Sequence, residues 1–427
     1  MTTTRLAIII IVVLLLAYLL RVGFFSFALY VLLGLVAVSQ LMGRFSLVGI
    51  RHERHCSVVK ARIGDTVTMR TEVVNDKPLP VLWVLMDDQV PSGLSCRGER
   101  GRAMLMRPFQ RHQLRYTVAL SRRGYHRLGP LVLESGDAFG LVRRFRAGRS
   151  AHYVTVYPQV VHITRYELMT RRPVGEVRVR QRMYEDPTRL AGVREYARGD
   201  PLSRIHWKAT AKTRRLHSKV YDHSTMIGAN IVLDFDERAW AEDYRFYRSE
   251  LAIVAAASIA NYIAEQKQLV GFISNGGDAA RRAREEMEEL QATSRRQLER
   301  LLAERDRSEA LRPVEVPPRK AGANLLEIFE TLARLELQPG LSLAQMLMSE
   351  YNRLPRDAAL VLIVPQVPPA LVQTIARLKT AGFVVSVFVV LNEEEHLMAR
   401  ARLAQEGVSV FHLTREADLS VLAIQTI

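Results

Sequence analysis

The chain has few of the residues that common catalytic and redox motifs require. Its 427 residues include two cysteines, Cys56 and Cys96, which cannot form a multi-bridge disulfide framework and lie in no C-x-x-C pair. Two thiols in a chain of this size fit a reducing compartment. The sequence also lacks a P-loop, a nucleophile elbow and a G-x-G-x-x-G turn between a strand and a helix. These absences exclude the usual nucleotide-binding and hydrolase signatures.

The histidines follow no metal-binding pattern. His206, His217 and His223 match no standard zinc spacing, and no helical H-x-x-x-H pair occurs. A histidine beside a tryptophan, as His206 is beside Trp207, is more often packed or hydrogen-bonded than a ligand. We therefore expect no zinc site.

Acidic residues are fewer than basic ones, 44 against 60, which gives a formal net charge of +16. Such a charge suggests an anionic neighbour, whether lipid headgroups, nucleic acid or an acidic protein. No basic motif interleaved with aromatic residues, of the kind that binds RNA or DNA, is present. We therefore do not expect nucleic acid as a partner.

What the chain does have, first of all, is two long apolar segments at its start. Residues 6–20 are apolar, Arg21 interrupts, and residues 22–41 are almost wholly apolar. A spanning helix needs about 20 apolar residues. The second segment has this length, and the first has it only if residues flanking its two ends are included. A signal peptide is the alternative, but no A-x-A-like cleavage site follows. We predict a transmembrane helical hairpin over residues 1–45, with its turn at residues 21–23.

The flanking charges predict the orientation of this hairpin. Arg5 precedes it, Arg44, Arg51 and Arg54 follow it, and only Arg21 lies in the turn. Cationic flanks stay on the cytoplasmic side, so we expect a multi-pass protein of the bacterial cytoplasmic (inner) membrane, with its soluble domains facing the cytoplasm. If only one helix spans, the soluble part changes sides.

After residue 45 the spacing of apolar residues changes to the alternation that is typical of β-strands. Residues 66–73 alternate between polar and apolar, and further short apolar runs are separated by turns with Gly or Pro. These runs cover residues 81–85, 113–120, 131–133 and 153–157. Short strands without helices between them predict an immunoglobulin-like β-sandwich over residues 46–165, with a structural or binding role.

The densest group of polar and aromatic residues covers residues 194–212, in a segment (residues 166–225) that we expect to link two domains. Asp200 is a good N-cap and Pro201 suits the first helical position, which predicts a helix to about residue 212. On that helix Arg204, Lys208 and Lys212 form one cationic row. The candidate partner-binding residues are Arg194, Glu195, Tyr196, Gly199, Asp200, Arg204, Ile205, His206, Trp207, Lys208 and Lys212.

Two interpretations of this segment stay open. The cationic row beside Trp207 could bind an anion or a protein. Alternatively, Arg194, Asp200 and Arg204 could form a structural clamp that ties the helix to a neighbouring sheet, since ion-pair networks also occur outside active sites.

The same string is similar to the signature of the domain of unknown function 58 family, roughly R-E-Y-x-x-G-D-x-x-x-R-I-x-W-x-x-[ST]-A-[RK]. Every position matches, and further segments of resemblance lie at residues 123–125, 128–130, 137–141 and 156–158. One departure is Ala138, where the family more often has Pro. The resemblance implies a membrane-anchored protein with a von Willebrand factor A-like domain and a MoxR-type AAA+ ATPase as its partner.

From residue 226 to residue 427, buried-strand runs alternate with helical segments. The runs cover residues 230–234, 269–273, 359–364, 383–391 and 408–413. This alternation predicts a parallel, doubly wound sheet with right-handed crossovers, as in the von Willebrand factor A-like fold that the resemblance implies. Ligands of such sheets bind beyond the carboxyl ends of the strands.

The fold that the resemblance implies often holds a divalent cation through a D-x-S-x-S motif after its first strand. Here Asp234 is kept, while Asp236 and Arg238 occupy the hydroxyl positions and Pro365-Gln366 stands where a metal-binding relative often has Asp. Hard oxygen ligands are therefore too few for a standard Mg²⁺ site. Asp234 and Asp236 remain the residual metal candidates, with a capping or ion-pair role favoured, and we predict no cofactor.

A charged segment at about residues 277–318 interrupts the α/β pattern. Apolar residues recur in it at roughly helical spacing among many Arg and Glu. It could be a projecting helix that binds a partner or a solvated arm that folds back on its own domain, and both interpretations stay open.

These patterns leave two functions. The first is a membrane-anchored, non-enzymatic scaffold or adaptor that binds another protein through its A-like domain, with a MoxR-type AAA+ ATPase as the partner that the resemblance implies. The second is a metal-dependent enzyme that uses Asp234, Asp236 and the cationic row on a phosphorylated or acidic substrate. Because the enzyme would lack some of its metal ligands, we expect the scaffold or adaptor.

Overall fold

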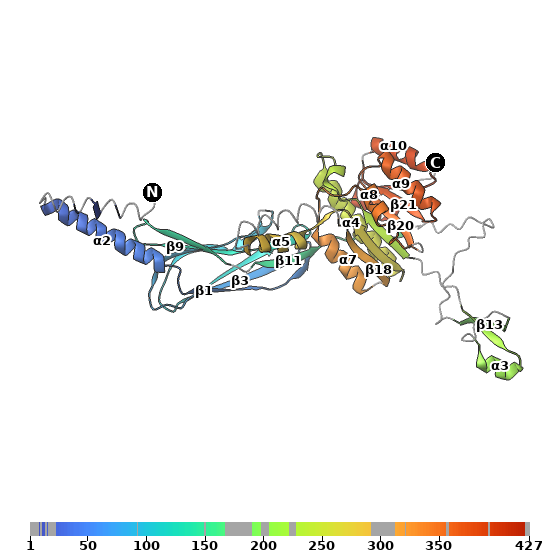
Figure 1. Cartoon of the computed structure of the whole chain (residues 1–427), viewed down its shortest axis with the longest axis horizontal. Helices are drawn as coiled ribbons and strands as arrows, with labels where there is room; N and C mark the ends of the chain where they lie inside the picture. The colour runs from blue at the N-terminus through green and yellow to red at the C-terminus, as the bar shows by residue number, and fades with distance from the viewer. Residues whose placement is uncertain are drawn as a thin grey trace. The chain divides into compact units, whose positions relative to one another are not determined.

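The computed structural model describes residues 8, 11–12, 15, 23–91, 93–148, 151–166, 190–197, 205–221, 228–291, 312–320, 322–355, 358–391 and 393–422. The chain divides into two compact units. The first comprises Met1–Gln159 with Leu332–Leu335, and the second comprises Val160–Thr331 with Glu336–Ile427. Figure 1 shows the helices and strands of both.

The first unit begins with helix α2 (Gly23–Phe45), which has no acidic residue in its first turn and Arg44 in its last. Its segment Phe27–Phe45 has the length and composition of a membrane-spanning helix and is mostly exposed. This is the second half of the predicted hairpin. Residues 8, 11–12 and 15 of the first half are helical, and the rest of it, with Arg21 and Val22 of the turn, lies outside the described residues.

The rest of the first unit is β-structure in three sheets. One sheet has the order β1 (Ile50–Cys56), β3 (Thr66–Asn75), β7 (Arg111–Ala119) and β5 (Ser95–Gly98). A second has the order β10 (Arg143–Ala147), β9 (Leu131–Gly136), β4 (Val81–Asp88) and β6 (Gly101–Met106). A third joins β2 (Lys60–Arg62), β11 (His152–Tyr157) and β8 (Gly124–Leu128).

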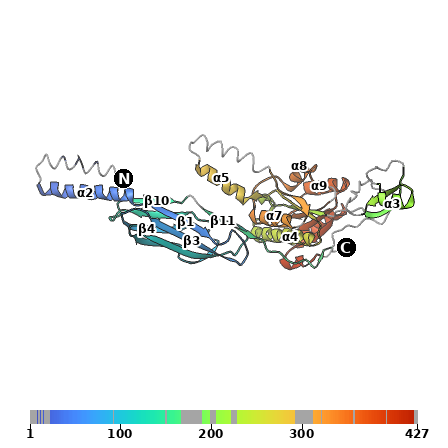
Figure 2. The ribbon, with the colours of Figure 1, turned by 90° about the horizontal axis from the view of Figure 1, so that it is seen from below.

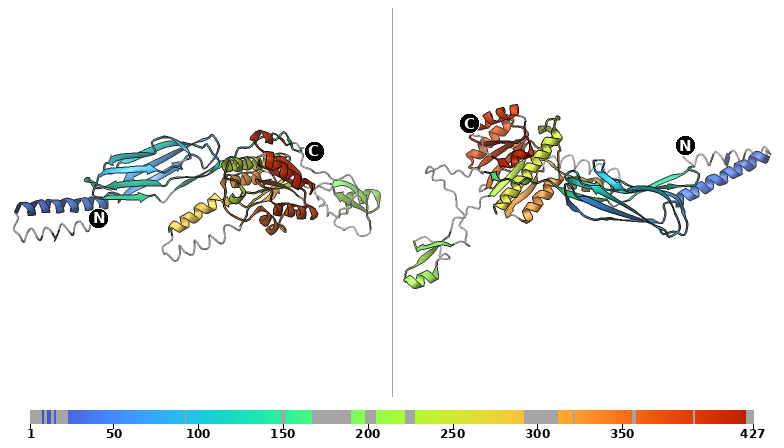
Figure 3. Two further views of the ribbon diagram at one scale, coloured as in Figure 1. Left: turned by 90° about the horizontal axis from the view of Figure 1, so that it is seen from above. Right: turned by 180° about the vertical axis from the view of Figure 1, so that it is seen from behind.

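Alternation along the strands explains how these sheets bury a common core. In β3 every second side chain is buried, among them Val67, Met69 and Val73. Val73 of the first sheet packs in one apolar cluster with Val84 and Leu133 of the second. The two four-stranded sheets therefore share a core, as the period-two pattern predicts. Figure 3 shows α2 leading into these strands.

The first unit also contains a buried ion pair that the sequence patterns do not reveal. Arg54 Nη2 lies 2.7 Å from Asp88 Oδ1, and the two side chains are 1% and 0% exposed. Thr71 Oγ1 donates to the other oxygen of Asp88 at 2.9 Å, and Arg54 Nη1 donates to the Leu128 carbonyl at 3.2 Å. The partners come from four strands, so only the folded sheets bring them together.

The second unit is built on a six-stranded sheet. Its order is β18 (Val314–Lys320), β16 (Leu269–Ser274), β15 (Gly228–Leu233), β20 (Ala358–Val364), β21 (Val385–Val389) and β22 (Ser409–His412). Five neighbouring strands of this sheet are parallel: β16, β15, β20, β21 and β22. The central strand β15 is buried along its whole length. The five predicted strand runs are the five parallel strands.

The prediction of a wholly parallel sheet is wrong at one edge. β18 runs antiparallel to β16, and it contains Pro317 and Pro318, at the end of the predicted charged segment. Proline has no N–H to donate, but an edge strand needs hydrogen bonds on one side only. Within the charged segment the structure describes α5 (Ala279–Gln291), whose Arg282 pairs with Glu336 at 3.0 Å. Residues 292–311 lie outside the described part.

Helices cover both faces of this sheet (Figure 2). The helices of the second unit are α4 (Arg245–Glu265), α7 (Ala323–Arg334), α8 (Leu343–Ser349), α9 (Pro369–Thr380) and α10 (Glu393–Ala404). The side chains of α8, α9 and α10 share one core with alternate residues of β20 and β21. Strand order reverses between β15 and β20, so right-handed crossovers place α4 on the face opposite α9 and α10.

The signature segment forms a small element of its own, a hairpin of β13 (Leu190–Glu195) and β14 (His217–Tyr221) with helix α3 (Trp207–Thr213). The prediction that the helix already includes residue 205 is wrong. Ile205 makes an antiparallel bridge with Ser218, which holds it extended, and His206 is the N-cap because its Nδ1 accepts from the Ala209 N–H. Asp200, Pro201 and Arg204 lie outside the described residues.

Candidate functional site

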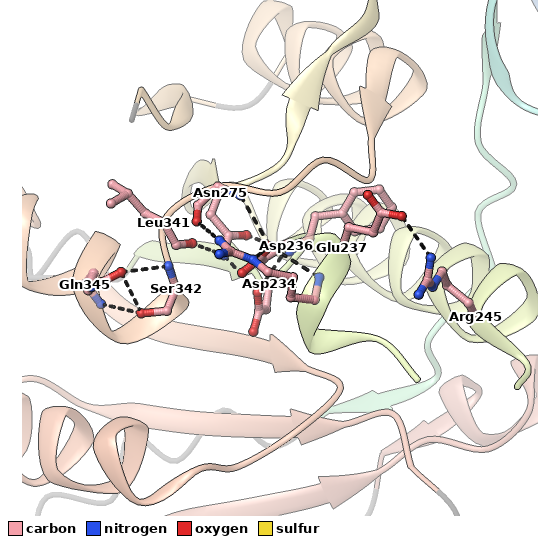
Figure 4. A network of polar contacts seen from close by, with 11 residues as sticks. Asp234, Asp236, Glu237, Arg245, Asn275, Leu341, Ser342 and Gln345 are labelled. Atoms are coloured by element: carbon pink, nitrogen blue, oxygen red, sulfur yellow. Dashed lines mark hydrogen bonds and ion pairs between the residues drawn. The ribbon is translucent and has the colours of Figure 1, made fainter. Parts of the chain in front are cut away.

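The candidate site lies at the carboxyl edge of the six-stranded sheet, where polar residues follow β15 and β16 (Figure 4). Asp234 comes directly after β15, and Asn275 directly after β16. Asn275 Nδ2 donates to Asp234 Oδ1 at 2.8 Å and to the Leu341 carbonyl at 2.9 Å. Asn275 Oδ1 accepts from the Phe235 N–H at 2.6 Å. One amide side chain thus joins three loops.

The carboxyl group of Asp234 is buried, with the residue only 6% exposed. Burial disfavours the charged form and raises the pKa of Asp234 to about 6, although the hydrogen bond from Asn275 opposes the shift. The nearby charge of Asp236 raises that pKa further. Trp240 Nε1 donates to the Asp234 backbone carbonyl at 3.2 Å, which fixes the turn after β15.

Asp236 is equally buried but serves a different purpose. Its Oδ1 accepts from Arg238 Nε at 3.2 Å, from the Arg238 N–H at 3.3 Å and from the Gly340 N–H at 3.3 Å. It is also the N-cap of the short helix η2 (Glu237–Ala239), and Glu237 pairs with Arg245 at 2.9 Å. The capping and ion-pair role predicted for Asp236 is therefore present.

This donor set does not fit a divalent cation. Arg238 sits at one of the hydroxyl positions of the metal motif and brings a guanidinium to the Asp236 carboxylate, where a cation would need that oxygen. Asp234, the other hard ligand, has a raised pKa and favours its neutral form more than an ordinary carboxyl does. Among the described residues, no three Asp, Glu, His or Cys side chains converge as a metal site would require.

A pocket of about 220 Å³ opens at the same edge, beyond the ends of β20 and β21. Its apolar part includes Trp240, Val367, Leu391 and Met398. The charged residues at the pocket are Arg248 of α4 and Glu395 and Arg402 of α10. Arg402 Nη1 donates to the Val367 carbonyl at 3.1 Å, and the guanidinium of Arg248 lies 5.5 Å from the centre of the Tyr244 ring.

The pocket lies where the sequence predicts that ligands bind, but most of the residues that line it were not among the sequence candidates. Pro365 and Gln366 line it, as their position after β20 suggests. Asn275 could have been found, because it directly follows a predicted strand as Asp234 does. Arg248 and Arg402 had no such signal, since each is one of many arginines on a predicted helical segment.

The described part of the signature segment presents its large side chain to solvent. Trp207 is 69% exposed, and Lys208 and Lys212 of the same helix are exposed as well. The cationic row therefore begins at Lys208 in the described residues, whereas Gly199, Asp200 and Arg204 lie outside them. The proposed clamp of Arg194 with Asp200 and Arg204 stays a prediction.

Backbone and side-chain contacts hold this element together. The Tyr196 N–H donates to the Leu216 carbonyl at 2.9 Å, and Glu195 pairs with Arg215 at 3.2 Å. The His217 N–H donates to Thr210 Oγ1 at 3.1 Å. Both described histidines of the segment, His206 and His217, make hydrogen bonds within it, as predicted for His206, and His223 lies outside the described residues.

Comparisons with solved structures are weak. A FixG-related protein from Vibrio parahaemolyticus resembles 25% of this chain and 96% of its own, at 8% identity and a TM-score of 0.18. The sporulation control protein Spo0M from Bacillus subtilis resembles 25% of this chain and 49% of its own, at 10% identity and a TM-score of 0.17. Scores this low support no conclusion about fold or function.

Sequence comparisons identify the family. The uncharacterized protein YeaD of Bacillus subtilis (strain 168) is 24% identical over 231 residues, which are 52% of this chain and 57% of that protein. The chain therefore matches little more than half the length of this relative. The model of the family described as "Protein of unknown function DUF58" matches residues 192–406, which is half of the chain and includes the signature string at residues 194–212 and the strands β15, β16, β20 and β21. This protein belongs to the DUF58 family.

Proposed function

We propose that this protein is a membrane-anchored, non-enzymatic scaffold or adaptor whose α/β unit binds another protein at the pocket beyond β20 and β21. The observation that carries the proposal is the lining of this pocket. A lining that is mainly apolar with a few charged groups is typical of sites that receive an anchoring side chain of a partner.

The geometry favours binding over chemistry. The polar residues at the strand ends are engaged with one another: Asn275 holds Asp234, and Asp236 caps η2 and pairs with Arg238. These contacts make the edge rigid, and a rigid edge loses little conformational entropy when a partner binds.

We also propose a fold for each unit and a location for the protein in the cell. We infer an A-like fold for the α/β unit, because Asp234 follows the first strand beside the point where strand order reverses. An immunoglobulin-like sandwich is our assignment for the sheets of the first unit. The multi-pass anchor in the cytoplasmic membrane, with the soluble units facing the cytoplasm, is supported by α2 and by the flanking arginines.

For the partner, the family resemblance suggests a MoxR-type AAA+ ATPase. We also expect lipid to contact the anchor, and we expect no nucleic-acid partner. The exposed Trp207 with Lys208 and Lys212 provides a second surface that an acidic partner could use.

A metal-dependent enzyme acting on a phosphorylated or acidic substrate is the alternative. One observation favours it: the pKa of Asp234 is raised to about 6, in the range that suits a general acid or base. Turnover of a phosphoester that requires Mg²⁺ and disappears in Asp234→Ala would establish this alternative in place of the scaffold.

Two adjacent side chains of α10 allow a matched test of the pocket. Met398 is 60% exposed and lines the pocket, whereas Leu397 is 58% exposed and is not among the lining residues. The full-length protein in detergent should co-purify with the AAA+ ATPase, lose it with Met398→Glu and keep it with Leu397→Glu. Equal capture by both variants would refute the pocket as the binding site.

A further inference from the structure

We propose that the end of the first unit where α2 enters is a lipid-contact surface, inserted into the headgroup layer of the membrane. This "α2-proximal end" comprises residues 45–49 and the three turns at residues 75–81, 106–111 and 136–143. The inference rests on the proposed membrane anchor. It adds that the β-structure itself enters the lipid interface beside the helix.

Polar contacts hold the last turns of α2 against these loops. Ser39 Oγ donates to Asp137 Oδ2 at 2.7 Å, and both residues are buried. Lys77 Nζ donates to the Phe45 and Ser46 carbonyls at 2.5 and 2.7 Å, which satisfies carbonyls at the end of the helix. A Cβ on Gly43 would lie 2.5 Å from Val142 Cγ1, so the glycine permits a close approach.

Asp137 shapes the turn that touches the helix. Its carboxylate accepts from the Phe139 N–H at 3.0 Å and from the Val142 N–H at 2.7 Å, and its backbone carbonyl accepts from Trp83 Nε1 at 2.9 Å. The turn at residues 136–143 is therefore a built structure with satisfied polar groups, which is a requirement for backbone near the hydrocarbon layer.

The position of Ser39 along α2 sets the depth of that turn. Ser39 lies six residues before Phe45, the last residue of α2, and at about 1.5 Å per residue this is about 9 Å along the axis. The polar layer on each side of a bilayer is roughly 5–7 Å thick, about half the difference between the whole bilayer and its hydrocarbon core. If Phe45 marks the membrane surface, the turn reaches headgroup depth or the start of the acyl chains.

Within the described part of the helix, a span that ended before Ser39 would be too short. From Gly23 to Val38 the helix has about 16 residues, or roughly 24 Å, which is short of the hydrocarbon core of about 30 Å. Including residues 39–45 brings the helix to the required length. The contact between Ser39 and Asp137 then lies within the membrane interface.

The side chains at this end suit that location. The strongly exposed phenylalanines among the described residues of the β-structure, Phe109, Phe139 and Phe145, all belong to it or to the strand next to it, and Phe145 is 81% exposed. Val48, Leu79 and Leu141 are exposed beside them. Exposed phenylalanine rings gathered at one end of the β-structure, with further apolar side chains beside them, mark an interaction surface.

Two further features point to lipid. Phe109 has a φ of 58°, a left-handed conformation that is unfavourable for a bulky residue and here presents the ring to the exterior. Arg44, Arg107, Arg143 and Arg144 are exposed around the apolar tips. Cations that surround inserted apolar side chains complement anionic headgroups. A second copy or a protein partner would have to approach alongside the membrane helix itself.

Site-specific fluorescence on the full-length protein in vesicles of neutral and anionic phospholipid tests this surface. In a background with Cys56→Ser and Cys96→Ser, an environment-sensitive dye is attached to Phe139→Cys or Phe145→Cys. The anchor control is Phe27→Cys in α2. The water control is Val59→Cys, which is exposed and follows Cys56 at the other end of β1.

Dyes at residues 139, 145 and 27 should shift to the blue and lose most of their emission to lipids that carry a quencher, whereas the dye at residue 59 should respond only to aqueous iodide. Quenching by lipid at residue 27 but not at 139 and 145 would overturn the inference and leave the anchor intact. No quenching by lipid at residue 27 would refute the anchor. Dyes at 139 and 145 that are protected from both quenchers would mean that protein covers this end, which also overturns the inference.

Discussion

Asn275 donates a hydrogen bond of 2.8 Å to Asp234 and so joins the ends of two adjacent parallel strands. The same amide nitrogen donates to the Leu341 carbonyl, so a single side chain organises the carboxyl edge of the sheet. The family signature does not include Asn275. The carboxyl edge is therefore a hydrogen-bonded polar frame beside a partly apolar pocket.

The raised pKa of Asp234 makes stability depend on pH. The folded state holds the proton up to about pH 6, whereas the unfolded chain releases it near pH 4. The folded state therefore binds more protons between these values, and this carboxyl makes the protein less stable as pH rises from about 4 through 6. Asp234→Asn should raise the free energy of unfolding at pH 7.5, on the order of 2 kcal/mol, and much less at pH 4.

Thermal unfolding of both proteins at several pH values checks this prediction. The difference between variant and wild type removes the contribution of other carboxyl groups. A difference that does not change between pH 4 and pH 7.5 would contradict the burial of an ionisable Asp234.

The Arg54–Asp88 pair should be the most sensitive polar contact of the first unit. Asp88→Ala leaves a buried guanidinium without its carboxylate, which should destabilise the unit by about 3–5 kcal/mol. Glu134→Ala removes an exposed pair with Arg143 and should change stability by less than about 1 kcal/mol. Denaturant unfolding measures the free energy of unfolding of both variants. Similar decreases in the two would show that the buried pair stabilises the unit no more than the exposed pair does.

Two glycines of α2 provide a test of how the helix docks. A side chain at Gly43 would meet Val142, whereas nothing lies within 4 Å of a Cβ at Gly34. Gly43→Leu should separate the end of α2 from the turn at residues 136–143 and lower the melting temperature of the detergent-solubilised protein. Gly34→Leu adds the same apolar group and should leave it unchanged. Equal melting temperatures would argue against the docking.

Trp207 should contribute to binding and little to stability. The side chain is 69% exposed, so Trp207→Ala should leave the melting temperature unchanged while reducing capture of the proposed ATPase partner. His206→Ala removes the cap of α3 and should destabilise the small element by about 1 kcal/mol. If Trp207→Ala unfolds the element and binding is retained, the structural interpretation of this segment is correct.

Magnesium should have no specific effect on stability. A ligand that binds only the folded state raises its stability, but the Asp236 carboxylate is already engaged by Arg238 and Gly340. Millimolar Mg²⁺ should therefore leave the melting temperature equal to that in a chelator at matched ionic strength. A rise that disappears in Asp236→Asn would reveal a metal site.

Much of the second unit could be predicted because its signals are local. Strand runs such as residues 359–364 are continuous apolar segments, and their alternation with helices identifies a doubly wound sheet. The edge strand β18 could not be found this way, since Pro317 and Pro318 argue against a strand and only its edge position makes them acceptable. The prediction that the helix includes residue 205 was wrong for a similar reason, because Ile205 is held extended by its bridge to Ser218, a contact that the local sequence does not reveal.

The sequence by itself determined the apolar helix at the start, the alternation of the strands, the α/β order and the family signature, since each depends on residues close together in the chain. Only the tertiary structure decided which distant residues meet: Arg54 with Asp88, Ser39 with Asp137, and Asn275 with Asp234. The physical reason is that a hydrogen bond or a pocket depends on distances between side chains, and sheet pairing and crossovers set those distances over separations of 34 to 98 residues.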